Sequence, residues 1–133
     1  MPDYLSVAEK HEFERVLNER YEQLRDEVQK SLNESDDLQL QALAGRVHDP
    51  GEESVADLIM DLNLQQLEQY TEEIRATEAA LGRLSNGTYG ICTECGAEIG
   101  VERLRAVPTA TRCVRCQALL EQQSADGGET PTL

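Results

Sequence analysis

All four cysteines of the chain lie in one segment, between Cys92 and Cys116. Cys92 and Cys95 form one C-x2-C pair, Cys113 and Cys116 form a second, and seventeen residues separate the pairs. This spacing is typical of a Zn²⁺ ion held by four thiolates, because each pair brings two sulfur atoms into one tight turn. Gly96, directly after Cys95, permits the backbone angles that such a turn needs. Protein then fills every coordination position, which predicts one structural zinc ion.

The sequence gives less support to other roles for the cysteines. A redox C-x-x-C needs only one pair and normally lies in a βαβ setting, which this chain lacks. The same four ligands could also hold iron, so the identity of the metal stays open at this point. A nucleic-acid-binding finger would need a Lys/Arg-rich helix beside it, and none is present. The chain also offers little to an enzyme, because spacing brings neither His11 nor His48 to a nucleophile.

Composition narrows the class of partner. The 133 residues include 12 basic and 26 acidic ones, a formal net charge of −14. Such a charge repels nucleic acid and anionic membrane surfaces, so we expect a protein partner with a basic surface. The N-terminus lacks a signal-peptide pattern, and no apolar run approaches the ~20 residues that span a bilayer. We therefore expect a cytoplasmic protein, acting as a monomer without membrane contact.

Elongated helices must position the cysteines, because a hydrophobic fraction of 39% and five aromatic residues leave little for a large core. Ser6 and Glu9 have the form of a capping box, which predicts a helix beginning near Val7. Its apolar stripe follows helical spacing: Phe13, Leu17, Leu24 and Val28. We expect this helix to continue to about Ala44, with residues 31–39 as the place where a kink or break would fall.

A second helix follows a loop signal at residues 45–51, where Gly45 and a Pro-Gly pair stand together. Its apolar positions, the later ones at heptad spacing with Thr77 in the seam, are Val55, Leu58, Ile59, Leu62, Leu67, Tyr70, Ile74, Leu81 and Leu84. Two helices of about 35 residues, each about 50 Å long, predict an antiparallel hairpin. Its tip would lie at about residues 45–56.

The predicted fold is therefore mainly α: a long antiparallel coiled-coil hairpin, a small four-cysteine zinc finger and a short C-terminal helix. We place the N-terminal helix and hairpin at residues 1–86, and the finger with the final helix at 87–123. The small polar segment 124–133 is expected to be disordered.

The segment "GTYGICTECGAEIGVERLRAVPTATRCVRCQ", residues 87–117, closely resembles the zinc finger of the DksA/TraR family of bacterial transcription regulators. Besides the cysteines, the matching positions are Gly87, Tyr89, Gly90, Ile99, Arg103, Leu104, Ala106, Pro108 and Ala110. A helical hairpin before the finger is also a property of that family. The resemblance covers nearly all of residues 1–123.

This resemblance implies a non-enzymatic regulator that binds RNA polymerase. Family members insert the coiled-coil tip through the secondary channel and alter initiation without contacting DNA. Their tip carries the pattern D-x-x-D-x-A, and the matching residues here are Asp49, Glu52 and Ser54. The alternative is a zinc-stapled coiled-coil adaptor with a different protein partner.

Some family members also bind the alarmone ppGpp, through basic residues on the second helix and around the finger. Here Val107 and Gln117 stand at two of those places, and residues 72–78 are acidic apart from Arg75. Because a phosphate-rich ligand is held mainly by Lys and Arg, we expect a weakened dependence on ppGpp.

Overall fold

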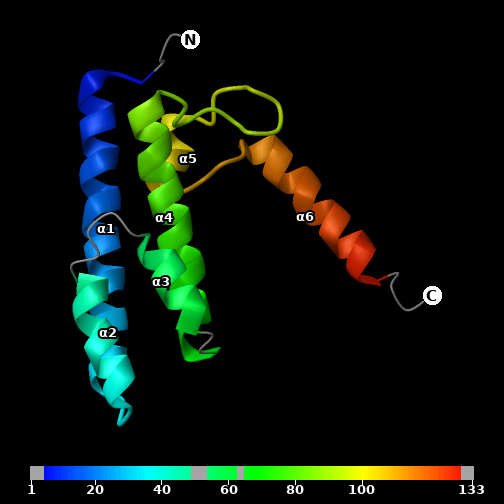
Figure 1. Cartoon of the computed structure of the whole chain (residues 1–133). Helices are drawn as coiled ribbons and strands as arrows, with labels where there is room; N and C mark the ends of the chain where they lie inside the picture. Colours follow the sequence, from blue (N-terminus) through cyan, green and yellow to red (C-terminus); the bar gives the residue numbers. More distant parts are fainter. Residues whose placement is uncertain (1–4, 49–53, 63–64, 130–133) are drawn as a thin grey trace.

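The computed structural model describes residues 5–48, 54–62 and 65–129. In chain order the elements are α1 (Val7–Asn33), α2 (Leu38–His48), α3 (Val55–Leu62), η1 (Gln65–Leu67), α4 (Glu68–Asn86), α5 (Val101–Ala106) and α6 (Val114–Glu129). α1 and α4 pack side by side and antiparallel, and α6 projects away from them (Figure 1). The predicted fold class is confirmed: an antiparallel helical pair leads into a four-cysteine segment and a C-terminal helix.

α1 begins where the sequence predicts, because Ser6 and Glu9 form the capping box. The backbone N–H of Glu9 donates to Ser6 Oγ at 3.0 Å, and the N–H of Ser6 donates to the Glu9 carboxylate at 2.9 Å. These bonds satisfy N–H groups that a helix start leaves without partners. The predicted apolar stripe is also confirmed, since its four members are buried: Phe13, Leu17, Leu24 and Val28.

α1 ends at Asn33, so the expectation of one helix continuing to about Ala44 is wrong. Residues 34–37 form a turn in which the N–H of Asp37 donates to Ser35 Oγ at 3.0 Å, and that of Gln39 donates to Asp37 Oδ1 at 2.8 Å. Ser and Asp side chains compete with the helical ladder for backbone N–H groups in this way. The chain reverses here, and α2 packs back along α1 (Figure 1).

The second predicted helix is divided as well. α3 ends at Leu62, η1 follows, and α4 begins at Glu68, with α3 packed back along α4. The expected tip at about residues 45–56 therefore needs correction on both sides. Gly45 lies inside α2 instead of ending a helix, and Val55 begins α3 beside α4. Residues 49–53 lie outside the described part of the chain.

Two apolar clusters hold these helices together. The first joins α1 to α4 and lies under α2 and α3: Leu24, Val28, Leu32, Ala44, Val47, Val55, Ala56, Ile59, Leu67 and Ile74. The second joins the other ends of α1 and α4 to the cysteine segment: Leu5, Phe13, Leu17, Ala80, Tyr89, Cys92, Ile99, Leu104 and Ala110. The finger is therefore built onto the base of the α1–α4 pair.

The C-terminal part of the chain contains the end of α4 and a final helix longer than expected. α4 ends at Asn86, where Gly87 takes a φ of 82° and its N–H donates to Arg83 O. α6 continues to Glu129, so residues 124–129 are helical where disorder was expected. Adding residues to an existing helix is far easier than starting one. In the described residues, no helix combines the length and apolar character needed to cross a membrane.

Candidate metal centre

The first cysteine pair lies in a tight turn between α4 and α5. The N–H of Gly96 donates to Cys92 O at 3.0 Å, and the N–H of Cys92 donates to Ala97 O at 2.8 Å. Gly96 has a φ of 77°, as the sequence predicts for the residue after Cys95. An isolated antiparallel bridge between Ile91 and Glu98 closes the turn.

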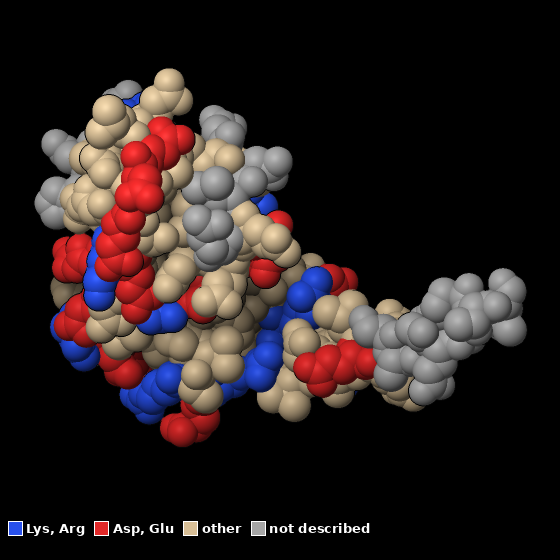
Figure 2. Space-filling model, turned by 90° about the horizontal axis from the view of Figure 1, so that it is seen from below, with Lys and Arg blue, Asp and Glu red and all other residues tan. Residues whose placement is uncertain are grey.

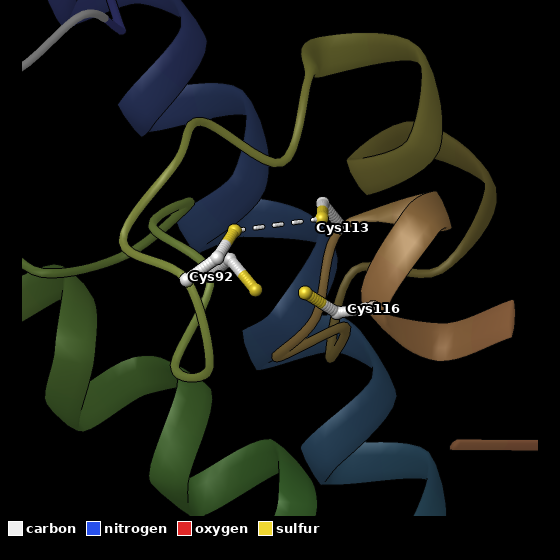
Figure 3. Close-up of side chains that lie close together, drawn as sticks. Cys92, Cys113 and Cys116 are labelled. Carbon is white, nitrogen blue, oxygen red and sulfur yellow. Dashed lines mark hydrogen bonds between the residues drawn. The ribbon is translucent and has the colours of Figure 1, made fainter. Parts of the chain in front are cut away.

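The second pair is fixed by the start of α6. The N–H of Gln117 donates to Cys113 O at 2.9 Å, which places Cys113 and Cys116 on the first helical turn. The N–H of Thr93 bonds to Thr111 O at 2.8 Å and joins the two cysteine turns. The cysteines of both turns therefore point toward one centre (Figure 3).

The four sulfur atoms have the separation that a zinc ion requires. All four Sγ atoms lie within 4.8 Å of one another, and Cys95 Sγ lies 3.8 Å from Cys113 Sγ. Tetrahedral Zn–S bonds of about 2.3 Å place ligand sulfurs about 3.8 Å apart. The four sulfurs therefore lie close enough together to act as ligands of one zinc ion.

The electrostatics of the thiols also favour a cation. The backbone N–H of Cys113, aided by those of Cys95 and Glu94, lowers the pKa of Cys92 to about 6. The Cys113 side chain, together with burial and the other thiols, raises the pKa of Cys116 to about 12. Four crowded sulfurs cannot all become thiolates unaided, because their charges repel. A divalent cation removes that conflict.

Arginine side chains brace the finger. Arg103 Nε donates to Arg112 O at 3.0 Å, and Arg112 lies 3.5 Å from the Glu94 carboxylate. Arg105 reaches across to α1, where its guanidinium Nε donates to the Glu12 carboxylate at 3.0 Å. This bond lowers the pKa of Glu12 and raises that of Arg105.

The charge of the chain is unevenly distributed. Residues 87–123 contain four arginines and four glutamates, so the formal charge of −14 resides in the rest of the chain. Figure 2 shows acidic side chains in a band over the helical body, with Lys and Arg gathered between the body and the projecting α6. The helical part therefore offers the acidic surface and the finger a balanced one.

A groove of about 420 Å³ lies where α1, α4 and the finger meet. Its apolar lining comes from Val16, Leu17, Ala76 and Pro108. Arg20 is the one cation among the described lining residues, and its guanidinium pairs with Glu73. With Glu72 also at this groove, its net charge is negative.

The structure also shows a connection that the sequence patterns do not predict, centred on Glu78. Its carboxylate accepts hydrogen bonds from Tyr21 Oη at 2.7 Å, Ser54 Oγ at 2.8 Å and the Val55 N–H at 3.0 Å. Burial and the Glu78 carboxylate raise the pKa of Tyr21. Pattern analysis missed Glu78 because its partners meet only when α3 folds back onto α4.

Of the three residues matched to the family's tip, the structure describes only Ser54. Ser54 precedes α3, where its Oγ also accepts the N–H of Asp57 at 3.2 Å. This is the position of an N-cap residue. Asp49 and Glu52 lie outside the described residues.

Comparisons with known proteins agree with this architecture. Residues 87–122 match the prokaryotic dksA/traR C4-type zinc finger. Over 119 residues the chain is 31% identical to the RNA polymerase-binding transcription factor DksA of Salmonella typhimurium, covering 90% of this chain and 76% of that protein. DksA of Escherichia coli shows the same identity and coverage.

Similarity extends to a solved structure. Transcription factor DksA2 from Pseudomonas aeruginosa aligns with a TM-score of 0.62 and 25% identity over 94% of each chain. The four gathered cysteines and the C4-type match together indicate one structural zinc ion. The sequence identity, the shared fold and the cysteine cluster place this chain in the DksA/TraR family.

Proposed function

We propose that this protein binds RNA polymerase directly, reaches its active centre through the secondary channel and modulates transcription initiation. It does so without catalysing a reaction and without binding DNA. The observation that carries the proposal is the 31% identity, over 90% of the chain, to relatives named RNA polymerase-binding transcription factors. The net charge of −14 supports a protein partner, since it opposes contact with the DNA backbone.

The zinc ion has a structural role in this proposal, with Cys92, Cys95, Cys113 and Cys116 as its four ligands. A full set of protein ligands leaves no position for water or substrate, so the ion supports the fold and performs no chemistry. Tyr89 in the finger packs on Phe13 of α1, with ring centroids 5.5 Å apart. By ordering the finger, zinc fixes the base from which the helical part extends.

The segment that carries Asp49, Glu52 and Ser54 is the part we assign to the polymerase active centre. Two carboxylates close together in the sequence are suited to act where metal ions and phosphates are handled. Glu52 replaces an aspartate of the family pattern and Ser54 replaces its alanine. Both acidic positions of the pattern therefore stay acidic, whereas its alanine position becomes polar.

The groove between α1, α4 and the finger supports a weakened response to ppGpp. Basic residues on the second helix and around the finger bind ppGpp in some family members. Here the corresponding face carries Glu72 and Glu73. Arg20, the one cation among the described residues that line the groove, is already paired with Glu73. A ligand with several phosphates would meet negative charge at this groove.

A binding experiment tests the proposal. Tagged protein is mixed with purified RNA polymerase or with promoter DNA alone, each with and without ppGpp, and the retained material is measured. We expect polymerase to be retained in every case and DNA alone in none. Failure to retain polymerase would leave the zinc-stapled adaptor with another protein partner as the better description.

A further inference from the structure

The Glu78 clasp, defined as the Glu78 carboxylate with Tyr21, Ser54 and Val55, joins three helices at one point. Tyr21 comes from α1 and Glu78 from α4, while Ser54 and Val55 begin α3. A carboxylate that accepts the first N–H of a helix also complements the positive end of its dipole. The clasp therefore stabilises the folded-back position of α3.

The apolar residues of α2 and α3 have a second set of possible partners. We name residues 7–48 the first arm and residues 55–86 the second arm. Since Tyr21 faces Glu78, straight arms in the same antiparallel register would place Leu40 opposite Ile59 and Leu43 opposite Ala56. These stripes pack on α1 and α4 in the structure, but they would pack on one another in straight arms. The same stripes therefore have apolar partners in both arrangements.

Two side chains favour the straight arrangement. Leu38 at the start of α2 is 77% exposed, and Met60 near the end of α3 is 47% exposed. In straight arms the same register would bring Leu38 next to Met60 across the seam. Contact between two exposed apolar side chains of this size would lower the free energy by removing apolar surface from water. The folded-back form leaves both side chains exposed to solvent.

The turn between α1 and α2 contains no residue that forbids a helix. Residues 34–37 are Glu, Ser, Asp and Asp, without Gly or Pro. The turn is held by exposed bonds, including one of 2.6 Å from Gln41 Nε2 to Ser35 O. Exposed bonds of this kind exchange readily with water, so the turn can become helical when packing favours it.

We propose that α2 and α3 form a latch with two positions. In the closed position, shown here, the Glu78 clasp holds Ser54 beside the middle of α4. In the open position both arms straighten, and residues 34–48 extend the first arm about 22 Å beyond the end of α1. RNA polymerase would select the open position because only a long hairpin reaches through a channel. This last step rests on the proposed function.

Distance measurements between two spin labels test the latch. The labels are placed at Asp57 in α3 and Glu102 in α5, both exposed, as non-cysteine amino acids that leave the zinc site untouched. Opening would lengthen their separation by about 30 Å, because α3 would stand at the far end of a straight arm. Ser54→Ala removes one bond of the clasp, and Glu78→Gln removes its charge while keeping the N-cap that Ser54 gives α3. Each should raise the open population of the free protein about tenfold.

Matched controls separate the clasp from general effects. Glu72→Gln removes an exposed carboxylate from the same helix, and Ser85→Ala removes an exposed hydroxyl; both should keep the wild-type distances. The latch is overturned if Ser54→Ala and Glu78→Gln also keep them, or if the free wild-type protein is entirely open. Adding polymerase should shift the wild type to the long distance. Polymerase that binds with the short distance retained contradicts selective binding, whereas polymerase that does not bind contradicts only the proposed function.

Discussion

The hydroxyl of Tyr89 donates a hydrogen bond of 2.7 Å to the carbonyl oxygen of Pro108. Tyr89 is 2% exposed and its ring lies against Phe13 of α1. One side chain therefore ties the loop after α5 to the N-terminal helix. The position of the finger depends on this contact as well as on zinc.

Tyr89→Phe should lower the free energy of unfolding by about 1–3 kcal/mol, because the part-buried carbonyl of Pro108 loses its partner. Chemical denaturation followed by circular dichroism measures the change. Tyr70→Phe, which removes a hydroxyl from a half-buried tyrosine in α4, serves as the control and should change stability less. Equal effects of the two substitutions would mean that the Tyr89–Pro108 bond adds no stability.

Cys113→Ser should release zinc and disorder the finger while most helix content survives. The first apolar cluster, with Leu24, Val28 and Ile74, does not include any finger residue. Elemental analysis should find one zinc per wild-type chain and none in the variant, with a modest loss of helical circular dichroism. Iron in the wild-type protein would contradict the assignment, and a complete loss of helix would show that the finger and the helices fold as one unit.

The local signals of the sequence predicted several features at the level of single residues. The capping box at Ser6 and Glu9 depends only on neighbouring backbone groups, and the spacing of the cysteine pairs is set by the geometry of one ion. The C-terminal end of α4 was likewise predictable, because Gly87 can adopt a positive φ. Such features need no knowledge of distant packing.

The reversal of both arms was not predictable in the same way. The apolar stripe weakens across residues 31–39 but resumes at Leu40 and Leu43, and it passes from Leu62 to Leu67, so the periodicity fits a straight helix as well as a folded one. Which form is adopted depends on whether Leu43 packs on α1 or on α3, and on the Glu78 clasp. The cluster of Asn33, Ser35 and Asp37 was the one local signal of a break.

The response to ppGpp should be weak in this protein and should strengthen when positive charge is restored. Val107→Arg with Gln117→Lys places basic side chains at positions where some relatives carry them. Each charge-assisted hydrogen bond to phosphate contributes roughly 1.5–3 kcal/mol, so ppGpp affinity should rise about tenfold or more. Transcription assays across a ppGpp series measure the change.

The control adds the same charge elsewhere on the finger. Val114 is 63% exposed at the start of α6, and Val114→Arg with Gln123→Lys should leave the ppGpp response unchanged. Strong synergy between ppGpp and the wild-type protein would contradict the reasoning from the acidic groove. An equal gain from the control pair would show that net charge, and not position, decides the response.

Asp49→Asn with Glu52→Gln should preserve folding and polymerase binding but remove most of the effect on transcription. Asn keeps the shape and capping ability of Asp while removing its charge. A structural role in the turn would therefore be kept, whereas a function that needs the negative charge would be lost. Melting temperature, polymerase retention and promoter-specific transcription are measured on the same preparations.

Glu34→Gln with Asp36→Asn removes the same charge from the exposed turn after α1 and should leave regulation unchanged. Unchanged regulation in the first pair would reduce that segment to a connection between α2 and α3, and a parallel loss of stability and regulation would make it structural. Retained binding with lost regulation supports carboxylates acting near the polymerase active centre.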